Sequence, residues 1–194
     1  PDAPSFNFDD FVAFGEQIAH QWDPSAKLDR FARLTPCDGI GSTAEQWTGF
    51  SYWRPYPYWF GKRIEWLEIS VSPDTPLASI VIWTGEPGTW DTLPTDLTQL
   101  KIDYATALQM ADAAGGAEYK AGHSTCFQRV VLTENQWNFG YLEDSWEQSD
   151  DVLHLCIDGI TGEPCEYWLP DDPPPENDKQ PPDIAGHSPS RDSA

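Results

Sequence analysis

Apolar residues recur every three or four positions in two segments, a spacing typical of helices that pack on a core. The first segment spans residues 9–22, and Asp9 is suited to cap its start. The second begins at Asp103, and Gly115 is suited to end it because glycine readily adopts the left-handed conformation found after helices. The apolar stripes of these predicted helices comprise Phe11, Phe14, Ile18 and Trp22, and Tyr104, Ala107, Leu108 and Ala111.

Between and after these helices the pattern changes to the alternation expected of half-buried strands. The clearest case is Leu67, Ile69 and Val71, which fall on one face of a predicted strand. Pro- and Gly-containing turns separate the strands. The predicted strands cover residues 29–37, 46–53, 65–72, 78–84, 125–133, 137–142, 152–158 and 163–168.

The order of elements is therefore helix and four strands, a linker, and again helix and four strands. This order predicts an α+β fold made of two repeats, each a helix packed on a small antiparallel sheet. The first repeat is expected at residues 1–85 and the second at 102–169, joined by a linker at 86–101. Residues 170–194 form an acidic, Pro-rich tail, which is expected to be extended.

The last two strands form a predicted hairpin that places two cysteines together. If Asp158 lies opposite Glu163, the constant sum of paired numbers along an antiparallel ladder puts Cys156 opposite Cys165. Directly opposed residues are close enough for a disulfide. Cys37 and Cys126 would then pair and tie the two repeats together, although four cysteines formally allow three pairings.

The second repeat resembles a known family. The helix sequence Ala-Leu-Gln-Met-Ala-Asp-Ala-Ala-Gly-Gly (107–116), the strand Trp-Asn-Phe-Gly-Tyr (137–141) and the turn Ile-Asp-Gly-Ile-Thr-Gly-Glu (157–163) together resemble a PepSY-like domain. The first repeat is similar in order but lacks the Thr-Gly-Glu turn. The resemblance implies a helix on a small antiparallel sheet, a location outside the cytoplasm and a binding or inhibitory role. It supplies no catalytic residues.

The net charge limits the classes of binding partner, and the cysteine content indicates the cellular compartment. The chain has 32 acidic against 11 basic residues and a formal net charge of −21, which argues against nucleic acid or an anionic membrane surface as partner. No apolar run approaches the roughly 20 residues of a membrane helix. The chain begins at Pro1 without Met, as expected for an exported protein whose signal peptide has been removed or for a trimmed chain. Four cysteines also favour an extracellular or cell-surface location.

A search for catalytic and ligand-binding motifs identifies no catalytic residue, cofactor or metal site. The sequence contains no HExxH, GxSxG or Gly-rich phosphate loop. The acidic run at 143–151 has the ligand type that calcium prefers but not the spacing of an EF-hand, so a solvated loop is the simpler interpretation. Asp158 and Glu163 are better explained by turn chemistry than as an acid–base pair.

Aromatic residues provide the strongest indication of a binding surface. Seven of the eleven positions from 50 to 60 are aromatic, in a chain with 10 Trp. Alternation sends Phe50 and Tyr52 to one face of the strand and Trp53 to the other, so part of this segment should be exposed unless it forms a second small core between the repeats. Pro-rich segments bind along aromatic surfaces, which suggests that the tail docks there, in the same chain or in another copy. The predicted interaction residues are Tyr52, Trp53, Tyr56, Tyr58, Trp59, Phe60, Pro173, Pro174 and Pro175.

These features favour a non-enzymatic exported protein that acts through protein–protein contacts, with other copies of itself as one partner, as in an extracellular filament or surface subunit. Three alternatives stay open: a regulator or inhibitor of a secreted peptidase, a carbohydrate-binding module that uses exposed Trp side chains, and a secreted hydrolase that uses two carboxylates facing one cleft.

Overall fold

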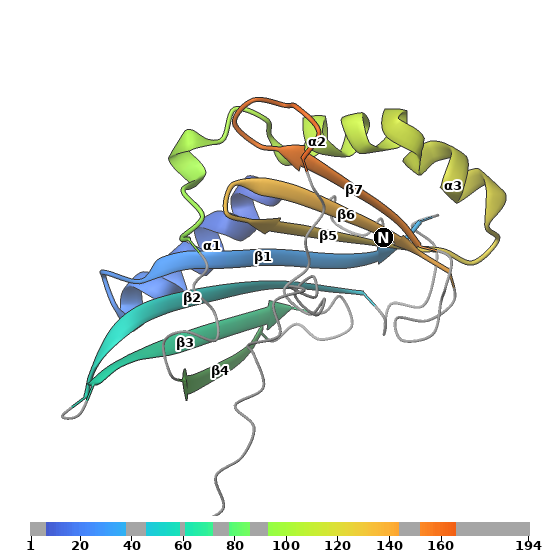
Figure 1. Cartoon of the computed structure of the whole chain (residues 1–194). Coiled ribbons are helices and arrows are strands. Elements are labelled where there is room, and N and C mark those ends of the chain that lie inside the picture. The colour runs from blue at the N-terminus through green and yellow to red at the C-terminus, as the bar shows by residue number, and fades with distance from the viewer. Residues whose placement is uncertain are drawn as a thin grey trace, which may run out of the picture.

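The strands of the protein form one antiparallel sheet. The computed structural model describes residues 7–37, 46–58, 61–71, 78–85, 93–143 and 152–165 (Figure 1). In this part of the chain the sheet has seven strands in the order β4-β3-β2-β1-β5-β6-β7. The strands are β1 (Lys27–Pro36), β2 (Trp47–Tyr58), β3 (Gly61–Val71), β4 (Ala78–Gly85), β5 (Phe127–Thr133), β6 (Gln136–Leu142) and β7 (Val152–Asp158).

The prediction of two repeats, each with its own small sheet, is wrong. β1 pairs with β2 on one side and with β5 on the other, so that Phe31 lies between Phe50 and Leu132. Separate sheets would leave the outer edge of both β1 and β5 unpaired, whereas joining them satisfies those backbone groups and creates one shared core. The architecture is therefore a single dominant sheet with helices packed against it, and its strands run outwards from the β1–β5 junction in both directions.

The helices fall close to where the sequence pattern places them. α1 covers Phe8–Trp22, and its cap is Asn7 rather than Asp9, because the Asn7 side chain accepts a hydrogen bond from the Asp9 backbone N–H at 3.0 Å. After a 3-10 turn at Leu97–Gln99, α2 spans Tyr104–Ala111 and is capped by Asp103.

Gly115 adopts the positive φ expected of it, 129°, but the chain does not leave the helix there. It passes through a π-helical turn, Asp112–Gly116, into α3, Ala117–Gly122. None of the described helices is long and apolar enough to cross a membrane.

The helices cover one face of the sheet, and the core lies between them. Phe8 of α1 packs edge-on against Phe31 of β1 with ring centroids 5.0 Å apart, and it contacts Trp137 of β6 at 5.3 Å and Tyr104 of α2 at 5.8 Å. Trp137 is fully buried, and its Nε1–H donates to the Ile102 carbonyl at 2.9 Å. Residues from both halves of the chain thus share one aromatic centre, which explains why the halves do not fold as separate units.

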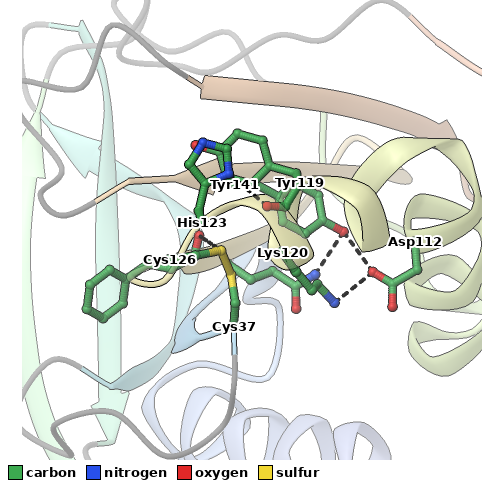
Figure 2. The surroundings of a disulfide bond; sticks show 9 residues. Cys37, Asp112, Tyr119, Lys120, His123, Cys126 and Tyr141 are labelled. Carbon is green, nitrogen blue, oxygen red and sulfur yellow. Dashed lines mark hydrogen bonds and ion pairs between the residues drawn. A yellow bond between two sulfur atoms is a disulfide. The ribbon is translucent and has the colours of Figure 1, made fainter.

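Both predicted disulfides are confirmed. Cys156 and Cys165 are bonded with Cα atoms 5.0 Å apart, next to the bridge between Ile157 and Pro164 that the pairing arithmetic requires. Cys37 and Cys126 are bonded across the β1–β5 junction with Cα atoms 5.3 Å apart (Figure 2). The Cys37–Cys126 bond therefore fastens the two halves of the chain where β1 and β5 join.

Candidate functional site: the open face and the free edge of the sheet

Strand pairing determines which side chains lie on the sheet face away from the helices. Phe50 and Leu67 belong to the core beneath the helices. Their neighbours Ser51 and Glu68 point the opposite way, because successive strand residues alternate between faces. We call this opposite surface, from β1 to β4, the open face.

A row of four residues crosses the open face from strand to strand. Arg30 lies opposite Ser51, Ser51 opposite Glu68, and Glu68 opposite Val81. Within the described part of the chain, the Arg30 guanidinium and the Glu68 carboxylate make no hydrogen bond or ion pair. The row therefore presents, on either side of a hydroxyl, a cation and an anion that no described residue neutralises.

A β-bulge lies directly before Arg30 on β1. The register of β1 against β2 shifts between Leu28, which lies opposite Tyr52, and Arg30, which lies opposite Ser51. The bulge inserts Asp29 as an extra residue, so Leu28 and Phe31 both face the core although they are three positions apart. Arg30 faces away from the helices by plain alternation from Phe31, and the bulge returns Leu28 to the core face and Lys27 to the open face opposite Trp53.

Beside this row the open face is hollowed. The hollow has a volume of about 180 Å³ and is floored by small residues of three adjacent strands, Ala32, Gly49, Ser51 and Ser70. Trp47 bounds it, because a Cβ added at Gly49 would lie 3.4 Å from the Trp47 ring. The hollow thus combines an aromatic ring, two hydroxyls and the charges of Arg30 and Glu68.

A row of tryptophans lies next to the polar row. Trp53 is opposite Trp66, and Trp66 is opposite Trp83. The rings of Trp66 and Trp83 stack with centroids 4.2 Å apart, and the Lys27 ammonium lies 5.7 Å from the Trp53 ring. Trp66 is buried in the row, whereas Trp83 at its outer end is 37% exposed. The outer end of the row therefore presents an accessible aromatic side chain.

β4 is an edge strand with an apolar surface. Its described backbone pairs with β3 alone, as Figure 1 shows at the lower border of the sheet. Ile80, Val81 and Ile82 are 51%, 50% and 51% exposed. The strand contains no charged residue or proline. It lacks the features by which proteins usually protect an edge from pairing with another chain, which makes it a candidate contact surface.

The predicted interaction residues occupy different places. Tyr52 is 2% exposed on the core face, where burial raises the pKa of its hydroxyl, whereas Trp53 belongs to the open face. Tyr56 and Tyr58 continue β2 in register with β3. Trp59, Phe60, Pro173, Pro174 and Pro175 lie outside the described residues, so a contact between tail and aromatic segment stays a prediction.

The polar cluster around the Cys37–Cys126 disulfide is structural (Figure 2). Tyr141 donates to Asp112 at 3.2 Å and accepts from Gln128 at 3.0 Å, and Lys120 pairs with the same carboxylate at 2.7 Å. Burial, reinforced by the Asp112 charge, raises the pKa of Tyr141. These contacts fasten the helical segment 112–120 to β5 and β6.

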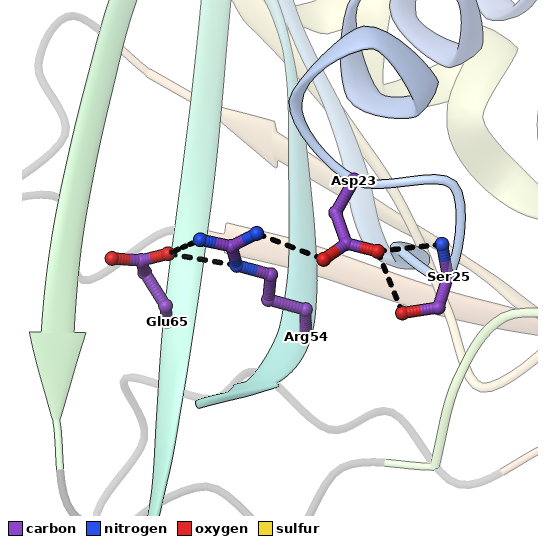
Figure 3. A network of polar contacts seen from close by, with 4 residues as sticks. All are labelled: Asp23, Ser25, Arg54 and Glu65. Carbon is purple, nitrogen blue, oxygen red and sulfur yellow. Dashed lines mark hydrogen bonds and ion pairs between the residues drawn. The ribbon is translucent and has the colours of Figure 1, made fainter. Parts of the chain in front are cut away.

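A second polar network joins α1 to the β2–β3 flank (Figure 3). Arg54 donates to Asp23 and to Glu65, each at 2.8 Å, and its guanidinium lies 4.5 Å from the Trp22 ring centroid. The Ser25 hydroxyl and backbone N–H each donate to Asp23 at 2.7 Å. The Ser25 bonds, followed by Arg54, lower the pKa of Asp23 from 3.8 to about 2.

Neither the side-chain geometry nor a comparison with known proteins identifies an activity. Among the described residues, no group of three or more His, Cys, Asp or Glu side chains is placed to hold a metal ion. The acidic run 143–151 lies outside these residues except for Glu143. No protein-family model, curated protein or solved structure matches the chain.

Two features of the candidate site were absent from the sequence-based prediction. The exposure of β4 depends on its position at the border of the sheet, and nothing in the run Ile80–Trp83 marks it as an edge. The hollow depends on the register that brings small residues of β1, β2 and β3 together, which alternation within one strand does not reveal.

Proposed function

We propose that the protein is an exported, non-enzymatic binding protein that acts through protein–protein contacts, and that β4 makes the contact. The observation that carries the proposal is an apolar edge strand whose outer backbone has no partner among the described residues. Two disulfides support export, because such bonds persist mainly in oxidising compartments. A PepSY-like relationship of residues 102–169 is part of the same proposal, since such domains usually lie outside the cytoplasm.

The mode of contact would be strand addition. A partner strand laid along β4 would pair with the N–H and C=O groups on the side away from β3, and these backbone bonds would supply affinity. Ile80 and Ile82 point to the helix side of the sheet, and Val81 points to the open face. A partner strand with apolar residues at alternate positions would cover both sides.

A second copy of this chain is the partner that β4 fits. Placing Ile80 of one copy opposite Ile82 of the other aligns Val81 with its own equivalent and keeps the helices of both copies on one side. No charge is buried in this arrangement, because none of the 8 residues of β4 is charged. The contact is therefore self-complementary despite the net charge of −21.

Such a contact is symmetric and closes on itself, so it produces a dimer and not a filament. It is also small, because it covers only a few half-exposed side chains, whereas stable interfaces bury about 1,200–2,000 Å² in total. The dimer should therefore be weak and concentration-dependent. A filament would need a further contact elsewhere on the molecule.

Sedimentation equilibrium of the full chain over a wide concentration range tests the proposal. We expect a monomer–dimer equilibrium that weakens at least tenfold in Ile80→Lys/Ile82→Lys, because paired lysines would face each other across the two-fold axis. Leu93→Lys is the matched control, since Leu93 is 68% exposed and lies outside β4. Association that persists unchanged in the double variant, or a wild type that stays monomeric throughout, would reject the β4 dimer.

A further inference from the structure

We propose that the hollow on the open face is a binding subsite for one residue of a neutral oligosaccharide. This inference is independent of strand addition at β4, because the hollow lies over β1, β2 and β3 and only Val81 reaches it from β4. It rests on the shape of the hollow, on its unpaired polar groups and on the adjoining tryptophans.

The shape results from small side chains placed in register. Ala32, Gly49 and Ser70 lie directly opposite one another on β1, β2 and β3, so a row of small residues crosses the sheet. Trp47 stands beside Gly49, where a Cβ would also lie 3.2 Å from the Ile69 carbonyl oxygen. A larger residue at position 49 would crowd this wall and fill the floor. The depression is thus built into the sheet and is bounded by an indole ring.

The polar groups of the hollow match the hydroxyls of a sugar. A vicinal diol can accept hydrogen bonds from the Arg30 guanidinium and donate to the Glu68 carboxylate, because each hydroxyl is both donor and acceptor. Ser51 and Ser70 add hydroxyls from the floor. Within the described residues neither charged group has another partner, so neither must be released before it can bind a ligand.

The size of the hollow favours a single ring. Its volume of about 180 Å³ is below the roughly 300–1,000 Å³ of pockets that enclose drug-sized ligands. Trp47 offers an apolar surface against which the C–H face of a pyranose can pack. A small polyhydroxylated ring with one apolar face therefore suits the hollow.

The tryptophan row provides a place for the next residue of an oligosaccharide. It lies two positions along each strand from the Arg30–Glu68 row, a distance of about 7 Å. A chain that fills the hollow can therefore extend toward Trp83, which is 37% exposed. The net charge of −21 disfavours acidic polysaccharides, so the proposed ligand is neutral.

A sugar array followed by calorimetry tests this inference. The full chain is applied to neutral β- and α-linked hexasaccharides of glucose, xylose, mannose and N-acetylglucosamine. We expect binding to at least one hexasaccharide, quenching of Trp fluorescence, and at least a tenfold loss of affinity in Glu68→Gln and in Trp47→Ala. Glu118→Gln on α3 is the matched control for removing a carboxylate and should bind like the wild type. Circular dichroism and thermal unfolding confirm that each variant is folded.

Two results would overturn the proposal: no binding to any neutral hexasaccharide, or binding that Glu68→Gln and Trp47→Ala leave unchanged. Binding of free amino acids or basic peptides in place of sugars would also overturn it, because Arg30 and Glu68 would then serve as charge partners. Ile80→Lys/Ile82→Lys should bind sugar normally, which separates this result from the dimer test.

Discussion

Two nearly identical apolar runs of this protein have opposite fates. Val130-Val131-Leu132 in β5 is 1%, 1% and 0% exposed, whereas Ile80-Val81-Ile82 in β4 is 51%, 50% and 51% exposed. Both runs form antiparallel strands of the same sheet. They differ in position, because β5 lies between β1 and β6 at the centre and β4 lies at the border.

The difference shows that hydrophobicity alone does not specify burial in this chain. β5 lies where the disulfide, the aromatic core and the helices meet, so its apolar residues stabilise the fold. β4 adds little to that core, and the same kind of residue is left available for contact. The following predictions test this division, from the centre of the sheet to its flank.

The largest loss of stability is expected from removing the central disulfide. Cys37–Cys126 closes a sequence separation of 89 residues at the centre, and Cys156–Cys165 closes 9 residues near the β7 border. By the loop-entropy relation, replacing both cysteines by serine should lower the free energy of unfolding by about 4.5 kcal/mol for the first pair and about 2.5 kcal/mol for the second. Urea unfolding of both double variants measures this order, and equal losses would contradict it.

Truncation of one residue in each apolar run should give the next largest loss, and in the buried run alone. Leu132→Ala removes a fully buried side chain and should cost about 2–5 kcal/mol, because a cavity is left in the core. Ile82→Ala should change stability by about 0.5 kcal/mol or less, because half of this side chain is already in water. Similar losses in thermal or urea unfolding would show that β4 is covered in solution.

The local elements of this fold could be predicted from sequence, and their assembly could not. Both helices, the first seven predicted strands and the Cys156–Cys165 pair follow from spacing rules that act within a few residues, and the Cys37–Cys126 pair was then left by elimination. The predicted strand at 163–168 is represented in the described residues by the single bridge of Pro164. The joining of β1 to β5 depends on backbone groups about 100 positions apart, such as those of Phe31 and Leu132. No periodicity within either half records that pairing, which is why separate sheets were the natural expectation.

The candidate site was predicted even less well, for a similar reason. The aromatic segment drew attention to Tyr52 and Trp53, and alternation correctly placed them on opposite faces. The hollow, however, arises from a register that brings Ala32, Gly49 and Ser70 together. These small residues have no distinctive pattern in the sequence.

Trp83 should contribute modestly to stability in spite of its size. It stacks on Trp66 at 4.2 Å but is 37% exposed at the end of its row. Trp83→Ala should cost about 1 kcal/mol, the usual worth of an aromatic pair plus a partly buried side chain. Trp137→Ala, which removes a fully buried ring, should cost about 3–5 kcal/mol in the same urea titration. Comparable losses would place the tryptophan row in the core.

The smallest effect is expected at the charged link between α1 and the β2–β3 flank. The pKa of Asp23 is lowered from 3.8 to about 2, chiefly by its hydrogen bonds from Ser25 and then by Arg54. A lowered pKa means that the folded state favours the carboxylate, so the stabilisation is complete above about pH 4 and disappears as the pH falls toward 2. The stability difference between wild type and Asp23→Asn should therefore shrink over that window in urea titrations. Asp10→Asn, an exposed substitution on α1, controls for the loss of one charge. A difference that stays constant between pH 2 and pH 6 would mean that the Asp23 carboxylate does not hold this flank to the helix.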